Sequence, residues 1–324
     1  MDNNATTSKN RAIRKVTICG DGCMNVIIKI PGELSRGTNT DVIRTVRRPG
    51  GNALVGALAL ANWQAGVSYI GVIGKDTYSD ELVESMHKTG VDYSGVIRQG
   101  STRISYAILD EDERTILDGR KESIELRPEH WHDNPEISKK FYEADLIMID
   151  RYCAGIHDLV LQTVRKRRDN GETTTLIYRT GSRPSHGFEI EHNILPSTDI
   201  CLTKKTYLDN LKLDINPVEA CKKLSAQFNV PVVVATLGRE GAVYYNYNKN
   251  EGAIVPGKRL ISLQTSLGGG DFFRAGFISS YLEGLSIKEC TRHGNIVAAL
   301  HCSKPETSEV SSLFFSKKEV EEYE

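Results

Sequence analysis

The chain has 324 residues, of which 39% are hydrophobic and 26% are charged, the profile of a globular protein rather than a disordered one. Lysine plus arginine (41) and aspartate plus glutamate (42) nearly cancel, so the formal net charge is -1. Because nucleic acids and anionic membranes are bound by a surplus of basic residues, neither is expected as a partner. No apolar run approaches the roughly 20 residues that a membrane helix requires.

The cysteines and the amino-terminal residues indicate in which cellular compartment the protein is expected. The seven cysteines are scattered, odd in number and without Cys-x-x-Cys spacing, which predicts free, buried thiols in a reducing environment. Residues 1–14 form a polar lead that lacks the apolar centre of a signal peptide. We therefore expect a disordered lead and a cytoplasmic protein.

In the first half of the chain, short β-rich segments surround two helices. Val16–Gly20 is predicted as a buried strand, and Val26–Ile30 with Val42–Arg47 as a hairpin set apart from the main sheet. Asn52–Trp63 is rich in small apolar residues and is predicted as a tightly packed helix. A strand, an amphipathic helix and a second two-stranded piece follow at Val67–Ile73, Asp80–Lys88, Ile104–Leu109 and Arg114–Asp118.

Beyond residue 145, strands and helices alternate regularly, which predicts a parallel sheet with crossover helices. The expected elements are strands at Leu146–Ile149, Thr175–Tyr178, Asp199–Leu202 and Val232–Thr236, a hairpin of Gly241–Tyr247 and Glu251–Pro256, and helices at Asp271–Leu282 and Ile287–His301. We predict an α/β fold in one domain over residues 1–324. Its central sheet is mainly parallel and flanked by helices, and a small β lid comes from residues 26–48 and 102–118.

Three glycines directly precede an aspartate at the start of a helix in the segment QTSLGGGDFFRAGF, residues 264–277. Backbone amides without neighbouring side chains can converge on an anion, and a helix N-terminus adds about half a positive charge. Gly268, Gly269 and Gly270 could therefore bind a phosphate group. Asp271 could accept a proton from an attacking hydroxyl group, or it could simply cap the helix.

This segment resembles the C-terminal signature of the PfkB, or ribokinase-like, sugar kinase family, D-T-x-G-A-G-D followed by an apolar helix. Other blocks resemble the family in the same order: PGGNALVGALALANWQAG (49–66), YIGVIGKD (69–76), TGVDYSGV (89–96) and VVVATLGREGAVYY (232–245). The resemblance implies a ribokinase-like fold and a kinase that uses ATP and magnesium (Mg²⁺). It makes Gly268–Gly270 the anion hole and Asp271 the catalytic base. Lid pieces of this family often pair between subunits, which implies a homodimer through the lid.

The resemblance also implies the substrate-binding residues. Asn25, Gly50, Gly51 and Asn52 would bind hydroxyl groups of the substrate; a turn before a helix is the alternative explanation for the two glycines. Arg103 either contacts the substrate or lies solvated on the lid. The lid would close over the sugar and exclude water.

A second group of residues would bind the nucleotide. Thr236, Gly238 and Gly241 would line its phosphates at the carboxyl end of a strand, where open α/β sheets place ligands, although a hairpin turn would explain the two glycines as well. Asn295 matches a position that borders the adenine pocket.

Several positions depart from the family pattern. Asn25 replaces an aspartate that grips two hydroxyl groups, and Val55 replaces the asparagine of GG-x-x-x-N. The N-x-x-E motif, which organises magnesium and phosphate, falls on Thr203–Thr206 and has no carboxylate; Lys204 and Lys205 lie inside it. Two further aspartates of the pattern are replaced, by Thr265 and, at a strand end, by Arg179.

Two hypotheses follow. In the first, the protein is an ATP-dependent phosphotransferase that phosphorylates a hydroxymethyl group of a sugar or similar polyhydroxylated molecule, with magnesium held mainly by ATP and water. In the second, it is a degraded kinase that binds nucleotide or sugar in a regulatory or scaffold role. The retained glycines and Asp271 favour the first.

Two other site types find little support. A dinucleotide-binding dehydrogenase is disfavoured, because Gly20–Asp21–Gly22 lacks the third glycine and the following helix of G-x-G-x-x-G. His157, His186, His192 and His293 have no metal-ligand spacing, so no protein metal site is predicted.

Overall fold

The computed structural model describes residues 14–35, 37–64, 66–110, 114–119, 125–132, 134–181, 189–260, 263–305 and 314–323. Residues 1–13 of the expected lead, residues 111–113 of the turn between two expected strands, and His186 lie outside this part of the chain.

An eight-stranded sheet with the order β14-β13-β12-β11-β10-β9-β1-β4 forms the centre of the molecule. The strands from β12 to β4 are parallel, whereas β13 and β14 run antiparallel at one edge. This confirms the predicted parallel sheet with a hairpin at its edge. The strands are β1 (Val16–Cys19), β4 (Val67–Ile70), β9 (Leu146–Asp150), β10 (Thr175–Arg179), β11 (Ile200–Lys204), β12 (Val232–Thr236), β13 (Gly241–Asn246) and β14 (Glu251–Pro256).

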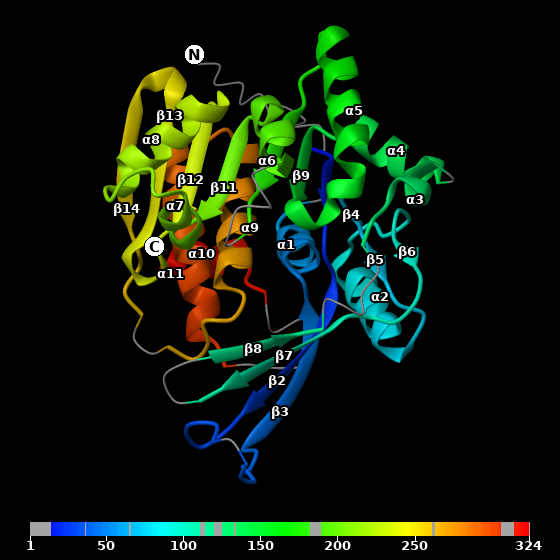
Figure 1. Ribbon diagram of the computed structural model, residues 1–324, viewed down its shortest axis with the longest axis vertical. Helices are drawn as coiled ribbons and strands as arrows, with labels where there is room; N and C mark the ends of the chain where they lie inside the picture. Colours follow the sequence, from blue (N-terminus) through cyan, green and yellow to red (C-terminus); the bar gives the residue numbers. More distant parts are fainter. Residues whose placement is uncertain are drawn as a thin grey trace, which may run out of the picture.

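Helices cover both faces of this sheet (Figure 1). Successive residues of a strand point to opposite faces, so Met148 of β9 packs in the core on one face while Ile147 and Ile149 pack in the core on the other. The first face is covered by α1 (Asn52–Ala61), α2 (Thr77–Thr89), α9 (Gly269–Leu282), α10 (Ile287–Ser303) and α11 (Lys317–Tyr323). The second is covered by α4 (Pro135–Glu143), α5 (His157–Asp169), α6 (Glu189–Ile194), α7 (Lys205–Leu211) and α8 (Pro217–Phe228), with α3 (Pro128–His132) beside α4.

A separate four-stranded sheet, here called the small sheet, has the order β3-β2-β7-β8. It consists of β2 (Cys23–Lys29), β3 (Arg44–Gly50), β7 (Ile104–Leu109) and β8 (Arg114–Asp118). Both predicted hairpins are present, and the parallel pairing of β2 with β7 joins them into one sheet. The small sheet lies beyond the carboxyl ends of the main strands (Figure 1).

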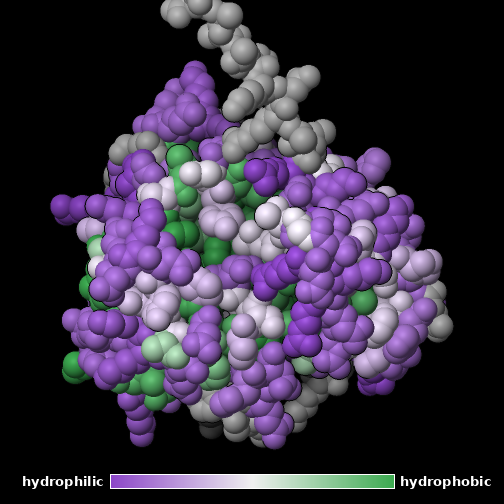
Figure 2. All heavy atoms as spheres, turned by 90° about the horizontal axis from the view of Figure 1, so that it is seen from above, coloured by the Kyte–Doolittle hydropathy of each residue, from purple (hydrophilic) through white to green (hydrophobic). Residues whose placement is uncertain are grey.

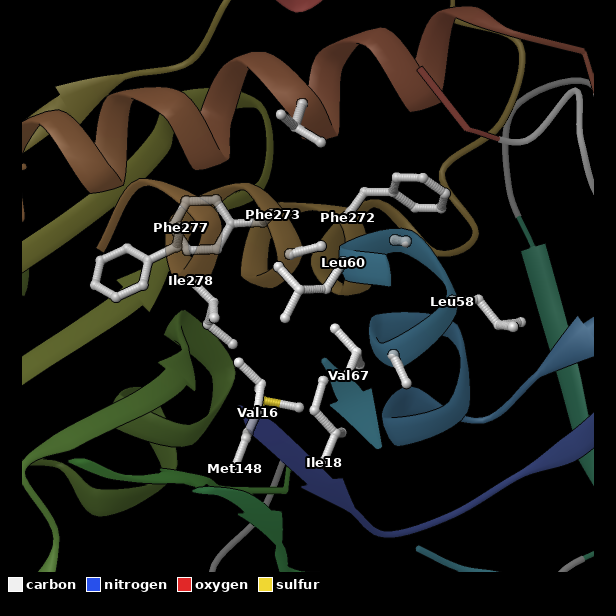
Figure 3. Packing of buried hydrophobic residues seen from close by; sticks show 14 of the residues in the cluster. Val16, Ile18, Leu58, Leu60, Val67, Met148, Phe272, Phe273, Phe277 and Ile278 are labelled. Atoms are coloured by element: carbon white, nitrogen blue, oxygen red, sulfur yellow. The ribbon is translucent and has the colours of Figure 1, made fainter. Parts of the chain in front are cut away.

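Several predicted boundaries were wrong. Helix α2 begins at Thr77 rather than Asp80, β2 begins at Cys23 rather than Val26, and β3 spans Arg44–Gly50 rather than Val42–Arg47. The expected strand Val67–Ile73 divides into β4 and β5 (Val72–Ile73), and β5 leaves the main sheet to pair with β6 (Ile97–Arg98). Helix α9 begins at Gly269, two residues earlier than expected, and Gly268 is its N-cap. The helix can include glycines because its apolar face is anchored: Phe272, Phe273, Phe277 and Ile278 pack in the core with residues of α1, β1 and β4 (Figure 3).

Candidate active site

The carboxyl ends of the parallel strands of the main sheet lie beside the first turn of α9. Arg179, Lys204 and Thr236 are the last residues of β10, β11 and β12. A small cavity lies at these strand ends and is lined by Arg179, Thr180, Leu202, Thr203, Lys204, Val234, Thr236, Phe273 and Arg274. Ligands of open α/β sheets bind at such strand ends.

Asp271 lies in the first turn of α9 and does not cap the helix. Its backbone N–H donates to the carbonyl of Gly268 (2.8 Å), and its carboxylate accepts a hydrogen bond from the guanidinium of Arg274. The amides of Gly269 and Gly270 belong to the same first turn, where no carbonyl four residues earlier is available as acceptor. The structure therefore places two helix-start amides beside an oriented carboxylate.

Two side chains bind the backbone carbonyl of Leu267, the residue just before the N-cap of α9. The carbonyl of Leu267 accepts from Nε2 of His301 (2.8 Å) and from Arg48 of the small sheet (3.2 Å). Burial, reinforced by the charge of Arg48, lowers the pKa of His301 to about 3, so its imidazole is neutral and Nε2 carries the donated hydrogen. In a trans peptide the N–H of Gly268 points opposite to this carbonyl, away from His301 and Arg48.

Gly268 could not be replaced without strain. Its φ angle is +90°, and a Cβ atom would lie 3.0 Å from Nε2 of His301. The sequence indicated that Gly268 belongs to an anion-binding turn, but it did not indicate that His301 and Arg48 bind the carbonyl beside it.

Positive charge dominates the cavity. Arg179 and Arg274 are each 5% exposed, and within the described residues Nη1 of Arg179 and Nε of Arg274 have no hydrogen-bond partner. Burial and the charges of Arg179 and Arg274 lower the pKa of Lys204 to about 8. Such a cluster of two buried cations and the partly buried Lys204 suits an anionic ligand.

On the side of the small sheet, Asp21 binds two of the predicted substrate residues. Its Oδ1 accepts the backbone N–H of Asn52 (2.8 Å) at the start of α1, and its Oδ2 accepts from Nη2 of Arg103 (2.8 Å). Arg103 is 7% exposed, so the expectation of a solvated lid arginine was wrong. Gly51 is the N-cap of α1, and a Cβ atom there would lie 2.5 Å from the carbonyl oxygen of Asp21.

Asn25 and Gly50 are neighbours on adjacent strands of the small sheet. A Cβ atom on Gly50 would overlap the amide group of Asn25. Gly50 therefore leaves room for the Asn25 side chain, a packing reason that the sequence did not reveal.

The predicted nucleotide residues are not all brought together. Thr236 lines the cavity. Gly238 lies two residues further on, and a Cβ atom added there would have no atom within 4 Å. Gly241 instead packs against the backbone of Gly257 in the edge hairpin, in line with the hairpin-turn alternative. Asn295 donates to the carbonyls of Val255 (2.9 Å) and Pro256 (3.1 Å) and so ties α10 to β14.

The model of the pfkB family of carbohydrate kinases matches residues 14–312. The chain belongs to this family. It is 21% identical over 249 residues to 2-dehydro-3-deoxygluconokinase of Haemophilus influenzae, covering 72% of this chain and 78% of that protein. It is 23% identical over 318 residues to ribokinase of Lactococcus lactis, covering 92% and 96% of the two chains.

Solved structures show the same fold. Arabidopsis thaliana ribokinase complexed with ribose and ATP superposes with a TM-score of 0.77 at 18% identity, covering 96% of this chain and 98% of that one. The fold is ribokinase-like, and the protein is a carbohydrate kinase of the pfkB type. The alternative of a non-catalytic relative gains no support from these likenesses. In the part of the chain that the structure describes, no helix is long and apolar enough to cross a membrane.

The sequence reading of this kinase missed Asp150, which ends β9. Its Oδ1 accepts the N–H of Tyr152 (2.8 Å), while Oδ2 is buried and without a partner within the described residues. Burial, and after it the negative charge of Asp21, raise the pKa of Asp150 to about 7. An acidic residue directly after the apolar run LIMI was the available signal.

Asp150→Asn should stabilise the kinase at alkaline pH. Between pH 4 and 7 the unfolded chain has already released this proton while the folded chain retains it, so stability falls as pH rises and the cost is complete above pH 7. The amide avoids that cost, and we expect the free energy of unfolding to rise by roughly 2–4 kcal/mol at pH 8 and by less at pH 5. Urea unfolding at both pH values checks this.

Asp158→Asn, at an exposed position of α5, is the matched control and should change the free energy of unfolding by at most about 1 kcal/mol. A variant at Asp150 that is less stable than wild type at pH 8 would contradict the assignment of a costly buried charge.

The donor set at the cavity does not suit a metal held by the protein. Thr203 donates to or accepts from Thr180 (2.6 Å), and Thr206 lies exposed on α7, so neither supplies the carboxylate of the N-x-x-E motif. Across the described ranges no group of three or more His, Cys, Asp or Glu residues could hold a metal ion. The cavity wall offers cations and hydroxyl groups instead.

A second cavity lies at the amino ends of the main strands, opposite the candidate active site, and its lining is chemically different. It is lined by Arg168, Glu172, Thr173, Thr174, Thr175, Asp199, Ile200, Pro231, Val232, Asn248 and Tyr281. Figure 2 looks onto this face, where hydrophilic residues surround a hollowed area. Its charges are already neutralised within the protein, since Arg168 pairs with Asp199 (2.7 Å) and Glu172 with Arg167 (2.9 Å).

Proposed function

We propose that this kinase transfers the terminal phosphoryl group of ATP to a hydroxymethyl group of a sugar or a similar polyhydroxylated molecule. The observation that carries the proposal is the first turn of α9, where the amides of Gly269 and Gly270 and the carboxylate of Asp271 lie together at the carboxyl edge of the sheet. The Arabidopsis relative, whose structure holds ribose and ATP, supports ATP as the phosphoryl donor.

The proposed chemistry divides between the carboxylate and the amides. Asp271, oriented by Arg274, takes the proton of the substrate hydroxyl group as its oxygen attacks phosphorus in line. The amides of residues 268–270 and the cations of the cavity stabilise the negative charge that accumulates on the phosphoryl oxygens. The residues lining the cavity supply no carboxylate, so magnesium would be held by ATP and water and would supply neutralisation of phosphate charge.

The small sheet is proposed to cover the substrate. Asn25 and the start of α1 at Gly51 and Asn52 face the sugar hydroxyl groups, with Gly50 making room for Asn25. Arg103 acts through Asp21, which it pairs with and which caps α1. Arg114 of β8 already donates to Ser266, next to the glycine run, so the small sheet reaches the anion site and can exclude water from it.

Four further features stay proposals. The nucleotide base would lie near Asn295 and Gly238, beyond Thr236. Two subunits would pair through their small sheets, and the chain would form one kinase domain. A cytoplasmic location agrees with the seven cysteines, all of which are free thiols.

The deciding test is ADP release with Mg-ATP against a panel of sugars, sugar acids, sugar phosphates and nucleosides. We expect one polyhydroxylated compound to stimulate ADP release far above the background without acceptor, with a product phosphorylated at a hydroxymethyl carbon, identified by phosphorus NMR. Background rates across the whole panel would contradict the proposed activity.

A further inference from the structure

The cations at the cavity are only partly compensated within the fold: Arg274 pairs with Asp271, and Arg179, in register with the buried Asp150, acts to lower the pKa of that carboxyl. Arg179, Lys204 and Arg274 lie on three elements, β10, β11 and α9, yet line one cavity. None of the nine lining residues carries a carboxylate. Asp271 pairs with Arg274, whereas Arg179 and Lys204 form no ion pair within the described residues.

Such an arrangement destabilises the ligand-free protein. Like charges brought together in a partly buried site repel one another, and the pKa of Lys204 is lowered first by burial and then by the charges of Arg179 and Arg274. A buried donor without an acceptor adds the cost of its lost hydration, as at Nη1 of Arg179 and Nε of Arg274. The cavity has a volume of only about 10 Å³, enough for one water molecule, so an anion with several acceptor oxygens would offset these costs by binding at its mouth as the cation side chains move toward it.

The place of the cavity indicates which anion. Thr236 pairs in register with Lys204 across β12 and β11 and lies on the wall of the cavity. Arg274 is one helical turn from Asp271 and bonds to it. An anion bound here therefore lies between the proposed path of the nucleotide and the proposed catalytic base.

We propose that Arg179, Lys204 and Arg274 form a phosphate clamp that binds the β- and γ-phosphates of the nucleotide directly. This rests on the proposed function, because it presupposes that the chain binds ATP. The clamp supplies positive charge at the point where Thr203–Thr206 lacks the carboxylate that would organise a metal ion. Nucleotide binding should accordingly depend little on magnesium.

The experiment is calorimetric titration of the full chain with ATP, ADP and AMP, in EDTA and in magnesium. We expect wild type to bind ATP in EDTA nearly as well as in magnesium. Lys204→Gln should weaken ATP and ADP binding roughly 10-fold to 100-fold, since it removes a charge-assisted hydrogen bond, and should leave AMP unchanged. Lys205→Gln is the matched control, because Lys205 is exposed and pairs with Asp209 (2.8 Å).

Two further measurements separate a ligand-binding role from a structural one. Thermal unfolding without nucleotide should show a higher melting temperature for Lys204→Gln than for wild type, because a partly buried like charge is removed. Arg179→Gln provides a second variant that should weaken ATP binding in the same way. Lower melting temperatures with wild-type ATP affinity in both variants would overturn the clamp.

The remaining outcomes distinguish other sources of the phosphate. If the two variants lose affinity only for a sugar phosphate, tested with fructose 6-phosphate alone, the clamp belongs to the acceptor and the nucleotide assignment is wrong. If wild type binds ATP only with magnesium, the cations do not replace the metal, and the inference fails while the proposed function stands. If wild type binds no nucleotide under either condition, the proposed function itself fails.

Discussion

Replacing Asp271 with asparagine should lower kcat by about 10²–10⁴-fold, the usual contribution of a positioned general base. Asparagine keeps the shape of the side chain and can still accept from Arg274, but it cannot take a proton from the substrate hydroxyl group. Nucleotide affinity should persist, because the amides of Gly269 and Gly270 and the cations of the cavity are unchanged. Coupled ADP assays and calorimetry with ATP measure the two effects separately.

Glu283→Gln is the control for this prediction, since Glu283 lies at the other end of the same helix and pairs with Lys317 (2.6 Å). It should leave kcat unchanged. If Asp271→Asn turned over at the wild-type rate, Asp271 would have no part in the chemistry.

The second large effect concerns the stability of the fold where Asp21, which follows β1 of the main sheet, pairs with Arg103, which precedes β7 of the small sheet. Arg103→Met should lower the free energy of unfolding by about 3–5 kcal/mol, because it leaves the buried carboxylate of Asp21 without its cation. The side chains of this pair are 6% and 8% exposed, and their Nη2–Oδ2 distance is 2.8 Å. Asp21 also caps α1, so the loss should loosen the start of that helix. Urea unfolding at neutral pH measures the change.

Arg47→Met removes a comparable ion pair at the surface and provides the control. Arg47 and Glu81 are 52% and 42% exposed and 3.1 Å apart, and such pairs contribute at most about 1 kcal/mol. Equal losses of stability in the two variants would mean that burial of the Arg103–Asp21 pair is not what matters.

Most strands and helices could be predicted because their signals are local. The alternating apolar strands and the glycines before Asp271 are read from neighbouring residues, and the predicted parallel sheet is present. The start of α9 was misjudged because glycine disfavours helix on its own, whereas packing of Phe272 and Phe273 against the core stabilises the first turn.

The candidate site was only partly predictable, because its remaining members are distant in sequence. Asp21, Arg103 and Asn52 meet through a contact between residues more than 80 positions apart. His301 and Arg48 hold the carbonyl of Leu267 from α10 and the small sheet. No periodicity or spacing reports such contacts.

The sequence by itself determined the fold class, the two hairpins, and the glycine run with its aspartate, since each depends on residue types at short spacing. Only the tertiary structure decided that β2 pairs with β7, and that Arg179, Lys204 and Arg274 share one cavity. Parallel strands gather their carboxyl ends at a single edge, whatever separates them along the chain. Charge that looks dispersed in the sequence is thereby concentrated, and this concentration is a property of the folded chain alone.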